Sequence, residues 1–241
     1  MKTALNFLDG SRRLVGQLTR PDKDEGPFPL MIYGHGYGYT FPLFDFELLA
    51  KRGIATYSFD FGGGAFDSQS DGSSLDMSVM TEAEEMSTVL NKLVKRPELD
   101  PSRVILCGHS QGAYAATVAG IHSQTMIKGM VLLSPAYIIS TYAKHYFAKS
   151  DRPKQFRFIN MSVSRKYFTD LRYYHPYAEM KKFDKPVVIV HGDADGMVPL
   201  SYSQRAAASF PHGHLIVAHG ASHMLEGYIP TIIDHISQMV K

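Results

Sequence analysis

The residues that most clearly indicate a chemical reaction lie at 108–112, where the chain reads Gly-His-Ser-Gln-Gly, a G-x-S-x-G pattern. The four apolar residues before it, 104–107, are typical of a buried strand, and the small residues after it are typical of a closely packed helix. A sharp turn from strand to helix strains the backbone of its serine and exposes the hydroxyl, and glycines on either side leave room for that turn. The pattern therefore predicts that Ser110 is a nucleophile.

A serine hydroxyl needs a neighbouring base before it can attack a carbonyl group. His223 lies directly after the last predicted strand and before the last predicted helix, so it can reach the carboxyl edge of the sheet, where the serine turn opens. His219 is the alternative, but its place at the end of the strand favours a packing role. We expect His223 to accept the proton of Ser110.

A carboxylate must orient the imidazole and stabilise its cation. The loop after the seventh predicted strand carries two candidates, Asp193 and Asp195. Asp195 stands where the loop turns toward the next helix. Asp193 is nearer the strand and suits a local turn, in which its side chain accepts backbone N–H groups. We expect Asp195 to be the acid, which gives the chain order Ser, Asp, His.

Two backbone N–H groups would stabilise the oxyanion that forms when the serine attacks. Gln111 follows the nucleophile directly and is expected to supply the first. Tyr37, after the third predicted strand, is expected to supply the second, because the glycines on both sides of it let the backbone turn inward. His35 is expected to brace this loop at the edge of the substrate pocket.

Composition and motifs argue against several other classes of function. The net charge is only +2, which does not indicate a nucleic-acid partner, and the single cysteine, Cys107, cannot form an intramolecular disulfide. The three glycines at 62–64 lack the phosphate-binding patterns, and no zinc motif is present, so we expect neither a cofactor nor a metal. No apolar run reaches the roughly 18 residues of a membrane-spanning helix. We expect a cytoplasmic protein with a small-molecule ester as its partner, and the sequence is compatible with a homodimer.

Short apolar runs alternate with longer helical patterns, which predicts an α/β fold with about eight strands in a mostly parallel sheet and helices on both faces. Asp9-Gly10 between the first two runs predicts an antiparallel hairpin at the N-terminal edge. Pro230 is expected to kink or split the last helix. The predicted strands cover 5–8, 14–18, 29–33, 54–59, 104–107, 130–133, 187–190 and 215–218, and the predicted helices cover 43–51, 77–95, a segment from about 111, and 224–240.

These motifs resemble the α/β-hydrolase superfamily over nearly the whole chain. More narrowly, the chain resembles bacterial cinnamoyl/feruloyl esterases and their acylglycerol-lipase-like relatives, in the segments 35–38, 59–62 with 70–72, 108–112 and 191–195. Those esterases often carry Asn-Gly-His where this chain has the three glycines. The resemblance implies a carboxylic ester hydrolase that acts through an acyl-enzyme on hydroxycinnamoyl, other small aromatic, or short acyl esters.

A stretch of 49 residues, 137–185, interrupts the pattern after the sixth predicted strand. We expect it to be an inserted lid or cap on a core formed by 1–136 and 186–241, and the resemblance implies that it covers the acyl site. It holds twelve of the 28 Tyr and Phe residues of the chain, and eleven Lys or Arg against four Asp or Glu, a net charge of +7. Its rings could wall a pocket or form a core of their own, and its charge could bind anionic substrates or face solvent. The candidates for the pocket are Tyr137, Tyr142, Tyr167 and Tyr173, with Tyr146, Phe147, Phe168 and Tyr174 as further rings.

Other functions are compatible with the same motifs. A monoacylglycerol-type lipase or a peptidase would use the same three residues. A ligand-binding receptor on a hydrolase fold is the alternative outside enzymes, but such a protein usually lacks a member of the triad. The basic insertion could also bind RNA, which would show as salt-sensitive retention on polyanions.

Overall fold

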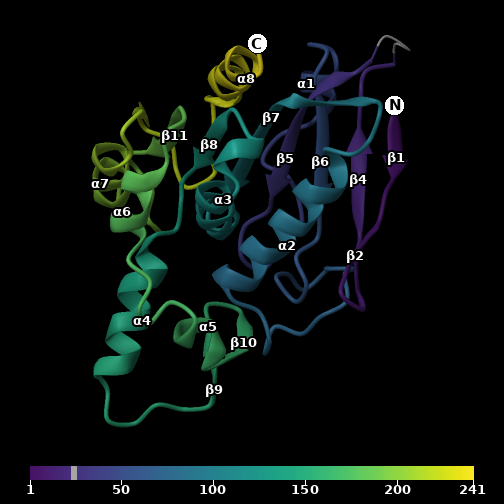
Figure 1. Ribbon diagram of the computed structural model, residues 1–241. Coiled ribbons are helices and arrows are strands. Elements are labelled where there is room, and N and C mark those ends of the chain that lie inside the picture. The colour runs from purple at the N-terminus through teal and green to yellow at the C-terminus, as the bar shows by residue number, and fades with distance from the viewer. Residues whose placement is uncertain (23–25) are drawn as a thin grey trace.

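The computed structural model describes residues 1–22 and 26–241 and contains one eight-stranded sheet (Figure 1). The two N-terminal strands of the sheet pair antiparallel to their neighbours, and the remaining strands are parallel. The mostly parallel sheet predicted from the sequence is confirmed. In spatial order its strands are β1 (Lys2–Ala4), β4 (Gly16–Thr19), β6 (Ala55–Phe59), β5 (Phe28–Gly34), β7 (Leu99–His109), β8 (Gly129–Leu133), β11 (Val187–Gly192) and β12 (Gly213–Ala218).

The N-terminal hairpin forms, but outside this sheet. β2 (Phe7–Asp9) and β3 (Arg12–Leu14) pair antiparallel around Gly10, whose φ of +60° suits glycine. The edge strand β1 lies before the segment 5–8 that was predicted as a strand, so that prediction was displaced by a few residues. The first predicted strand, 5–8, overlaps only β2 of the hairpin, whereas the second, 14–18, is divided between β3 of the hairpin and β4 of the sheet.

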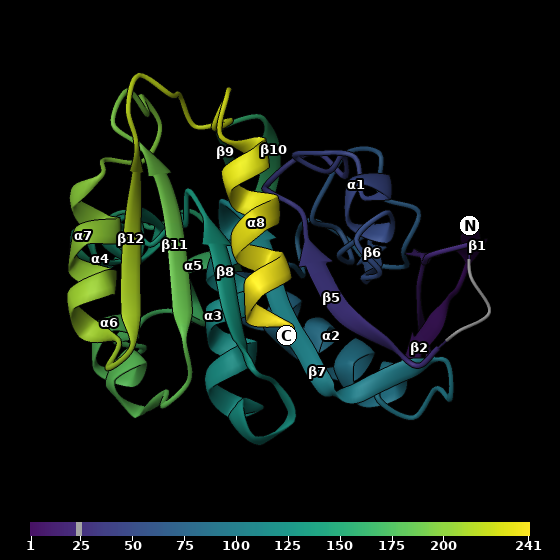
Figure 2. The same ribbon diagram turned by 90° about the horizontal axis from the view of Figure 1, so that it is seen from above.

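Helices cover both faces of the sheet (Figure 2). The apolar side chains of α1 (Glu47–Ala50) and α8 (Ile229–Met239) pack against one face. Those of α2 (Val79–Leu93), α3 (Gln111–His122) and α7 (Ser201–Ser209) pack against the other. The central strand β5 is buried along its whole length, as expected for a parallel strand covered on both sides.

Two predicted helices were wrong in extent. The segment 43–51 contains only the single turn α1. The closing helix begins at Ile229, and Pro230 occupies its first turn, where the missing N–H would have had no partner in the helix. Proline therefore starts this helix and does not kink it, and residues 224–228 form turns.

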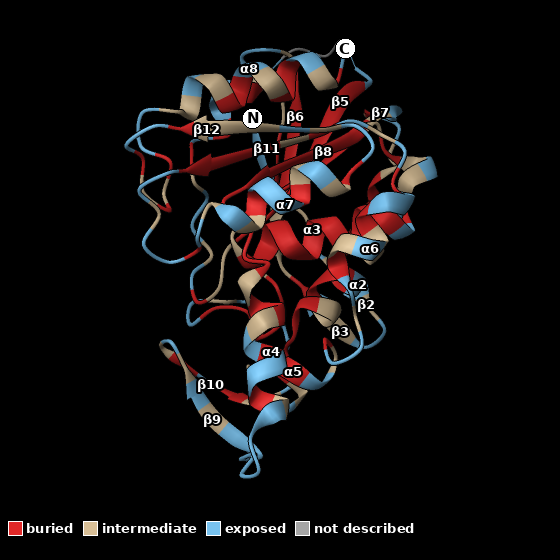
Figure 3. Ribbon diagram, turned by 90° about the vertical axis from the view of Figure 1, so that its left-hand side faces the viewer, coloured by how far each residue is buried: buried red, intermediate tan, exposed pale blue. Residues whose placement is uncertain are grey.

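The insertion has secondary structure of its own, which the sequence did not reveal. Figures 1 and 3 show α4, α5, β9 and β10 extending away from the sheet. The rings of Tyr146, Phe156 and Phe168 pack with centroids 5.3–5.4 Å apart, so part of the aromatic set forms a local core. The elements are α4 (Ile138–Ala148), β9 (Gln155–Phe158), β10 (Met161–Ser164), α5 (Lys166–Thr169), α6 (Pro176–Glu179) and a short 3-10 helix, Met180–Lys182.

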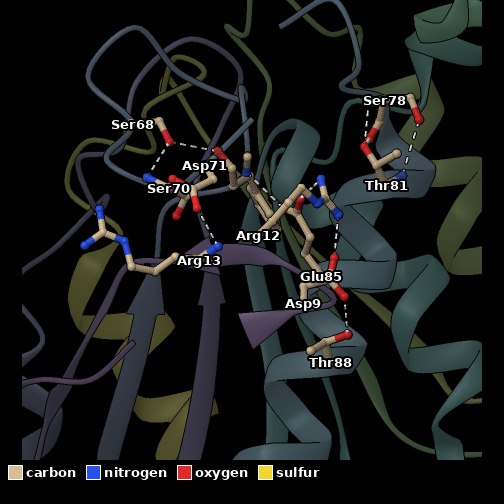
Figure 4. A network of polar contacts seen from close by, with 12 residues as sticks. Asp9, Arg12, Arg13, Ser68, Ser70, Asp71, Ser78, Thr81, Glu85 and Thr88 are labelled. Atoms are coloured by element: carbon tan, nitrogen blue, oxygen red, sulfur yellow. Dashed lines mark hydrogen bonds and ion pairs between the residues drawn. The ribbon is translucent and has the colours of Figure 1, made fainter. Parts of the chain in front are cut away.

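A polar network joins the N-terminal hairpin to helix α2 (Figure 4). Arg12 contacts Asp9 and donates to the buried Glu85 at 3.0 Å, and Thr88 donates to Asp9 at 3.0 Å. Glu85 also accepts the backbone N–H of Gly62 at 3.0 Å. Burial raises the pKa of Glu85 from 4.5 to about 7, although the bonds from Gly62 and Arg12 oppose the shift.

The network makes stability depend on pH. The folded protein binds more protons than the unfolded chain between the two pKa values of Glu85, 4.5 and about 7, so the free energy of unfolding falls as the pH rises through this range. Glu85→Gln removes this contribution. We expect urea unfolding to show that the free energy of unfolding of the variant minus that of wild type rises by about 2 kcal/mol from pH 5 to pH 8. For Glu84→Gln, at an exposed neighbouring position, this change with pH should stay near zero. No change with pH for Glu85→Gln would contradict the account.

Candidate active site

Ser110 occupies the turn between β7 and α3 in a strained conformation, with φ 56° and ψ −118°. Its N–H donates to the Leu133 carbonyl at 2.8 Å, and its own carbonyl accepts the N–H of Ala136 at 3.0 Å. Any side chain at the two flanking glycine positions would clash with the backbone around it. A Cβ on Gly112 would lie 2.2 Å from the His35 carbonyl oxygen, and one on Gly108 would lie 2.3 Å from the Gly112 carbonyl oxygen.

His223 and Asp195 lie together at the carboxyl edge of the sheet. His223 Nδ1 is 2.7 Å from Asp195 Oδ2, and the Asp195 side chain is fully buried. The backbone N–H groups of Met197 and Val198 donate to Asp195 Oδ1 at 2.8 and 2.9 Å. Burial alone would raise the pKa of Asp195, but the hydrogen bonds from His191, His223 and the Val198 N–H outweigh it and hold the pKa far below its usual range. Asp195 is therefore ionised at neutral pH.

His191 is a supporting residue that the sequence reasoning missed. Its Nε2 lies 3.1 Å from Asp195 Oδ2 and 2.9 Å from the Val198 carbonyl, so this nitrogen carries the proton. Its Nδ1 then accepts the Ser203 hydroxyl at 2.7 Å. His191 and His223 contact the same oxygen of the Asp195 carboxylate. The place of His191 at the end of β11, before the acidic loop, was its only sequence signal.

His109, the second residue of the G-x-S-x-G pattern, was also missed. Its Nε2 donates to the His223 backbone carbonyl at 3.0 Å, and the two rings lie 4.9 Å apart. Burial lowers the pKa of His109 to about 4, so the ring is neutral at pH 7. It fixes the backbone of His223 and adds no positive charge beside it.

Asp193 and His219, the alternative candidates for the acid and the base, contact each other. His219 Nδ1 lies 2.8 Å from Asp193 Oδ2, and Asp193 also accepts the N–H of Gly220 at 2.7 Å. Their side chains are 80% and 38% exposed, whereas those of His223 and Asp195 are 9% and 0% exposed. His219 does not line the cavity that contains Ser110, and His223 does.

Ser110 and His223 face the same cavity, but the Ser110 hydroxyl makes no hydrogen bond within the described ranges, 1–22 and 26–241. Contacts between nucleophile and base often tighten only when substrate binds. The structure therefore brings together the three residues that the sequence selected, with the pair His223–Asp195 already formed.

The two expected oxyanion donors, Tyr37 and Gln111, line the same cavity as Ser110. Gln111 is the first residue of α3, and backbone N–H groups in the first turn of a helix have no partner within the helix. Tyr37 lines the cavity, and its hydroxyl donates to the Phe158 carbonyl at 2.8 Å, which attaches its loop to the insertion. A Cβ on Gly36 would lie only 3.4 Å from Ser110 Cβ, so this loop passes close to the nucleophile.

The cavity beside Ser110 has a volume of about 250 Å³. Of the expected pocket residues, Tyr142 and Tyr167 line it, and three others require correction. Tyr137 is buried in the core, where its hydroxyl lies 2.7 Å from that of Thr117, and Tyr173 is 78% exposed beneath Arg172. The remaining lining residues are Gly36, Tyr37, Tyr39, Phe41, His109, Ser110, Gln111, Ala136, Ile138, Ile139, Phe158, Ile159, Asn160, Met197, Val198, His223 and Met224.

His35 is the third corrected residue, because it lies behind the loop and not on the cavity. Its Nε2 accepts the N–H of Phe61 at 3.0 Å, and its Nδ1 lies 2.8 Å from the Gly36 carbonyl. Burial lowers its pKa, against the Gly36 contact, so the neutral ring serves as a bridge between two loops.

Among residues 1–22 and 26–241, no three His, Cys, Asp or Glu side chains are grouped so that they could bind a metal. None of the helices in the same ranges combines the length and the apolar character needed to cross a bilayer.

Comparison with known proteins gives the following relationships. A family model described as "Serine aminopeptidase, S33" matches residues 27–177. No curated protein sequence matches the chain. Among solved structures, Est1E from Butyrivibrio proteoclasticus with bound ferulic acid is similar, with a TM-score of 0.85 and 23% identity over 98% of this chain and 97% of that one. DcsB in complex with a substrate analogue has a TM-score of 0.78 and 18% identity over 100% and 99%. The monoacylglycerol lipase of Paleococcus ferrophilus has a TM-score of 0.72 and 17% identity over 94% and 99%.

Proposed function

Since the chain belongs to the serine aminopeptidase S33 family and is a serine hydrolase of the α/β-hydrolase fold, we propose that it hydrolyses carboxylic esters through an acyl-enzyme on Ser110. The proposed acyl groups are hydroxycinnamoyl, other small aromatic, or short chains. Three features support this choice: the chemistry of the Ser110–His223–Asp195 set, the charge of the cavity, and its size.

In the proposed reaction His223 takes the proton of Ser110 as the serine oxygen attacks the ester carbonyl. The N–H groups of Tyr37 and Gln111 hold the oxyanion, and His223 then protonates the departing alkoxide. Water, deprotonated by the same histidine, attacks the acyl-enzyme, and His223 then returns the proton to the Ser110 oxygen as the acid is released. Asp195 stays ionised throughout, since its hydrogen bonds favour the carboxylate.

The lack of charged side chains among the described residues that line the cavity is the main reason to propose an ester and not an aminoacyl substrate. Within the described part of the chain, the lining contains no Asp, Glu, Lys or Arg. A free amino terminus is a cation, and burying it without a carboxylate partner is costly. A neutral ester carries no such penalty. We therefore favour ester hydrolysis, although the family carries the name of an aminopeptidase.

The size and lining of the cavity support a small acyl group. An apolar cavity of about 150 Å³ is enough to bind benzene. A volume of about 250 Å³, walled by Tyr142, Phe158 and Tyr167, suits one aromatic ring with a short side chain. The ferulic acid in the similar Est1E structure is a molecule of this kind.

Hydrolysis of monoacylglycerols is a second candidate, favoured by the mouth of the cavity. Tyr39, Phe41 and Ile159 line it and are exposed to solvent, so a longer acyl chain could continue across them.

We also propose that residues 137–185 act as a lid on the core formed by 1–136 and 186–241. The segment contributes Tyr142, Phe158 and Tyr167 to the lining, so its position sets the shape of the acyl site.

An ester and amide panel tests the proposal. We expect turnover of methyl ferulate, chlorogenate and p-nitrophenyl acetate or butyrate at least about 100-fold above that of aminoacyl p-nitroanilides, because the cavity offers the ammonium group no partner. Preference for p-nitrophenyl palmitate and a monoacylglycerol would favour the second candidate. Faster cleavage of the aminoacyl amides than of any ester would contradict the proposed substrate class.

A further inference from the structure

A chain of buried polar side chains runs from helix α2, past the nucleophile, to the insertion. The Tyr167 hydroxyl donates to Gln111 Oε1 at 2.5 Å, and Gln111 Nε2 donates to Glu82 Oε1 at 2.8 Å. Tyr167, Gln111 and Glu82 are 0%, 1% and 2% exposed. Buried polar groups with both bonds satisfied restrict one another strongly, so the Gln111 side chain is held from two sides.

The surroundings of Glu82 favour its neutral form. Burial raises its pKa well above 4.5, the hydrogen bond from Gln111 lowers it, and the nearby Glu85 raises it again. Its Oε2 has no hydrogen-bond partner among residues 1–22 and 26–241, and an ionised oxygen in that position would be a buried, unpaired charge. A neutral carboxyl group avoids this cost and still presents Oε1 to Gln111.

We propose that Glu82 and Tyr167 are positioning residues for acyl transfer, which fix the Gln111 side chain so that its backbone N–H stays aimed at the oxyanion. The inference rests on the proposed function, in which Gln111 is an oxyanion donor. Neither Glu82 nor the Tyr167 hydroxyl reacts in the proposed mechanism.

Two observations make the position of Gln111 matter. Gln111 directly follows the strained Ser110, so a shift of its peptide moves the nucleophile and the donor together. The ring of Tyr167 lines the acyl cavity, so the network links the insertion that shapes the substrate site to the group that stabilises the transition state. Displacements of about 1 Å at such sites can cost about 100-fold in rate.

The first test removes only the hydroxyl of Tyr167. For Tyr167→Phe we expect kcat on p-nitrophenyl butyrate to fall about tenfold, with KM within about twofold, since the lost restraint acts on the transition state. The matched control is Tyr146→Phe, a buried tyrosine of the insertion whose hydroxyl donates to the Pro153 carbonyl at 2.6 Å, away from the cavity. Its kcat should stay within about twofold of wild type.

The second test compares two replacements of Glu82. Glu82→Leu removes the acceptor and is expected to lower kcat at least about tenfold. Glu82→Gln keeps an uncharged acceptor oxygen and should restore most of that loss at pH 7. Glu85→Gln, three residues along the same helix and without contact to Gln111, is the control and should leave kcat within about twofold.

Labelling of Ser110 by a fluorophosphonate separates this inference from the choice of substrate, because the phosphoryl oxygen uses the same donors whatever the natural ester is. If wild type is labelled but hydrolyses no ester, the proposed function fails, and the labelling rate still tests the network. Equal labelling rates for wild type and Tyr167→Phe, or equal losses for Glu82→Gln and Glu82→Leu in folded proteins, would overturn the inference.

Discussion

Replacing Ser110 with alanine is expected to lower kcat for ester hydrolysis by about 10⁴- to 10⁶-fold, because no other hydroxyl group in the proposed mechanism can form the acyl-enzyme. The residual rate would come from the Tyr37 and Gln111 N–H groups and from substrate binding. Steady-state assays with p-nitrophenyl butyrate measure the effect.

The fold should survive this change. The N–H and carbonyl of residue 110 bond to Leu133 and Ala136 whatever the side chain, and alanine has the same Cβ as serine in the strained turn. We therefore expect the Ser110→Ala variant to unfold at the wild-type temperature within a few degrees. Ser102→Ala, at the exposed beginning of the same strand, controls for contaminating esterases and should keep wild-type activity. A Ser110→Ala variant within about tenfold of wild type would exclude Ser110 as the nucleophile.

Replacing Asp195 with asparagine is expected to lower kcat by about 10⁴-fold, the effect of the same change in another serine hydrolase. Asparagine removes the charge that would stabilise the protonated His223, and its amide can donate to the imidazole and favour the wrong tautomer. The KM should change little, because Asp195 lies behind His223 and does not line the cavity. Steady-state kinetics at pH 7 give both values.

The alternative pair provides the matched controls for this experiment. Asp193→Asn removes the charge from the exposed contact with His219, and His219→Ala removes the contact itself. Each variant should keep kcat within about threefold of wild type. A loss of about 10³-fold or more in either one, with Asp195→Asn active, would move the acid and the base to the exposed pair.

The nucleophile turn could be predicted from the sequence because its signals are adjacent in the chain. Gly108 and Gly112 are required by contacts within the turn and with the end of β5, and the buried strand and the small-residue helix around them are visible as patterns. The positions of Asp195 and His223 followed from the order of the strands. The choice against Asp193 and His219 rested on their distance from the strand ends, and the structure pairs them with each other.

The supporting residues could not be predicted, since their roles depend on contacts between distant segments. His109 contacts the backbone carbonyl of His223, which lies 114 positions later in the chain. His191 is only four positions before Asp195, but its ring is oriented by the Ser203 hydroxyl and the Val198 carbonyl, contacts that form only when the following loop and helix have folded. Glu82 and Glu85 lie on the inner face of α2, where hydrophobicity alone would place apolar side chains.

Helix geometry decides which aromatic rings of the insertion enter the core and which line the cavity. Tyr137 and Tyr142 are five positions apart at and after the start of α4, which separates their directions by about 140° on a helix with 3.6 residues per turn. One ring therefore enters the core and the other the cavity. Composition counts such rings but does not separate them.

The central claim, an acyl-enzyme on Ser110 formed from an ester, can be tested directly by acid quench of the protein mixed with p-nitrophenyl butyrate or methyl ferulate, followed by mass spectrometry of its peptides. The account predicts that the peptide containing Ser110 gains the mass of the acyl group within the first turnover, and that Ser110→Ala gains none. An acyl group on any other residue, or turnover by wild type with no acylated peptide under conditions that trap a control serine esterase, would contradict it.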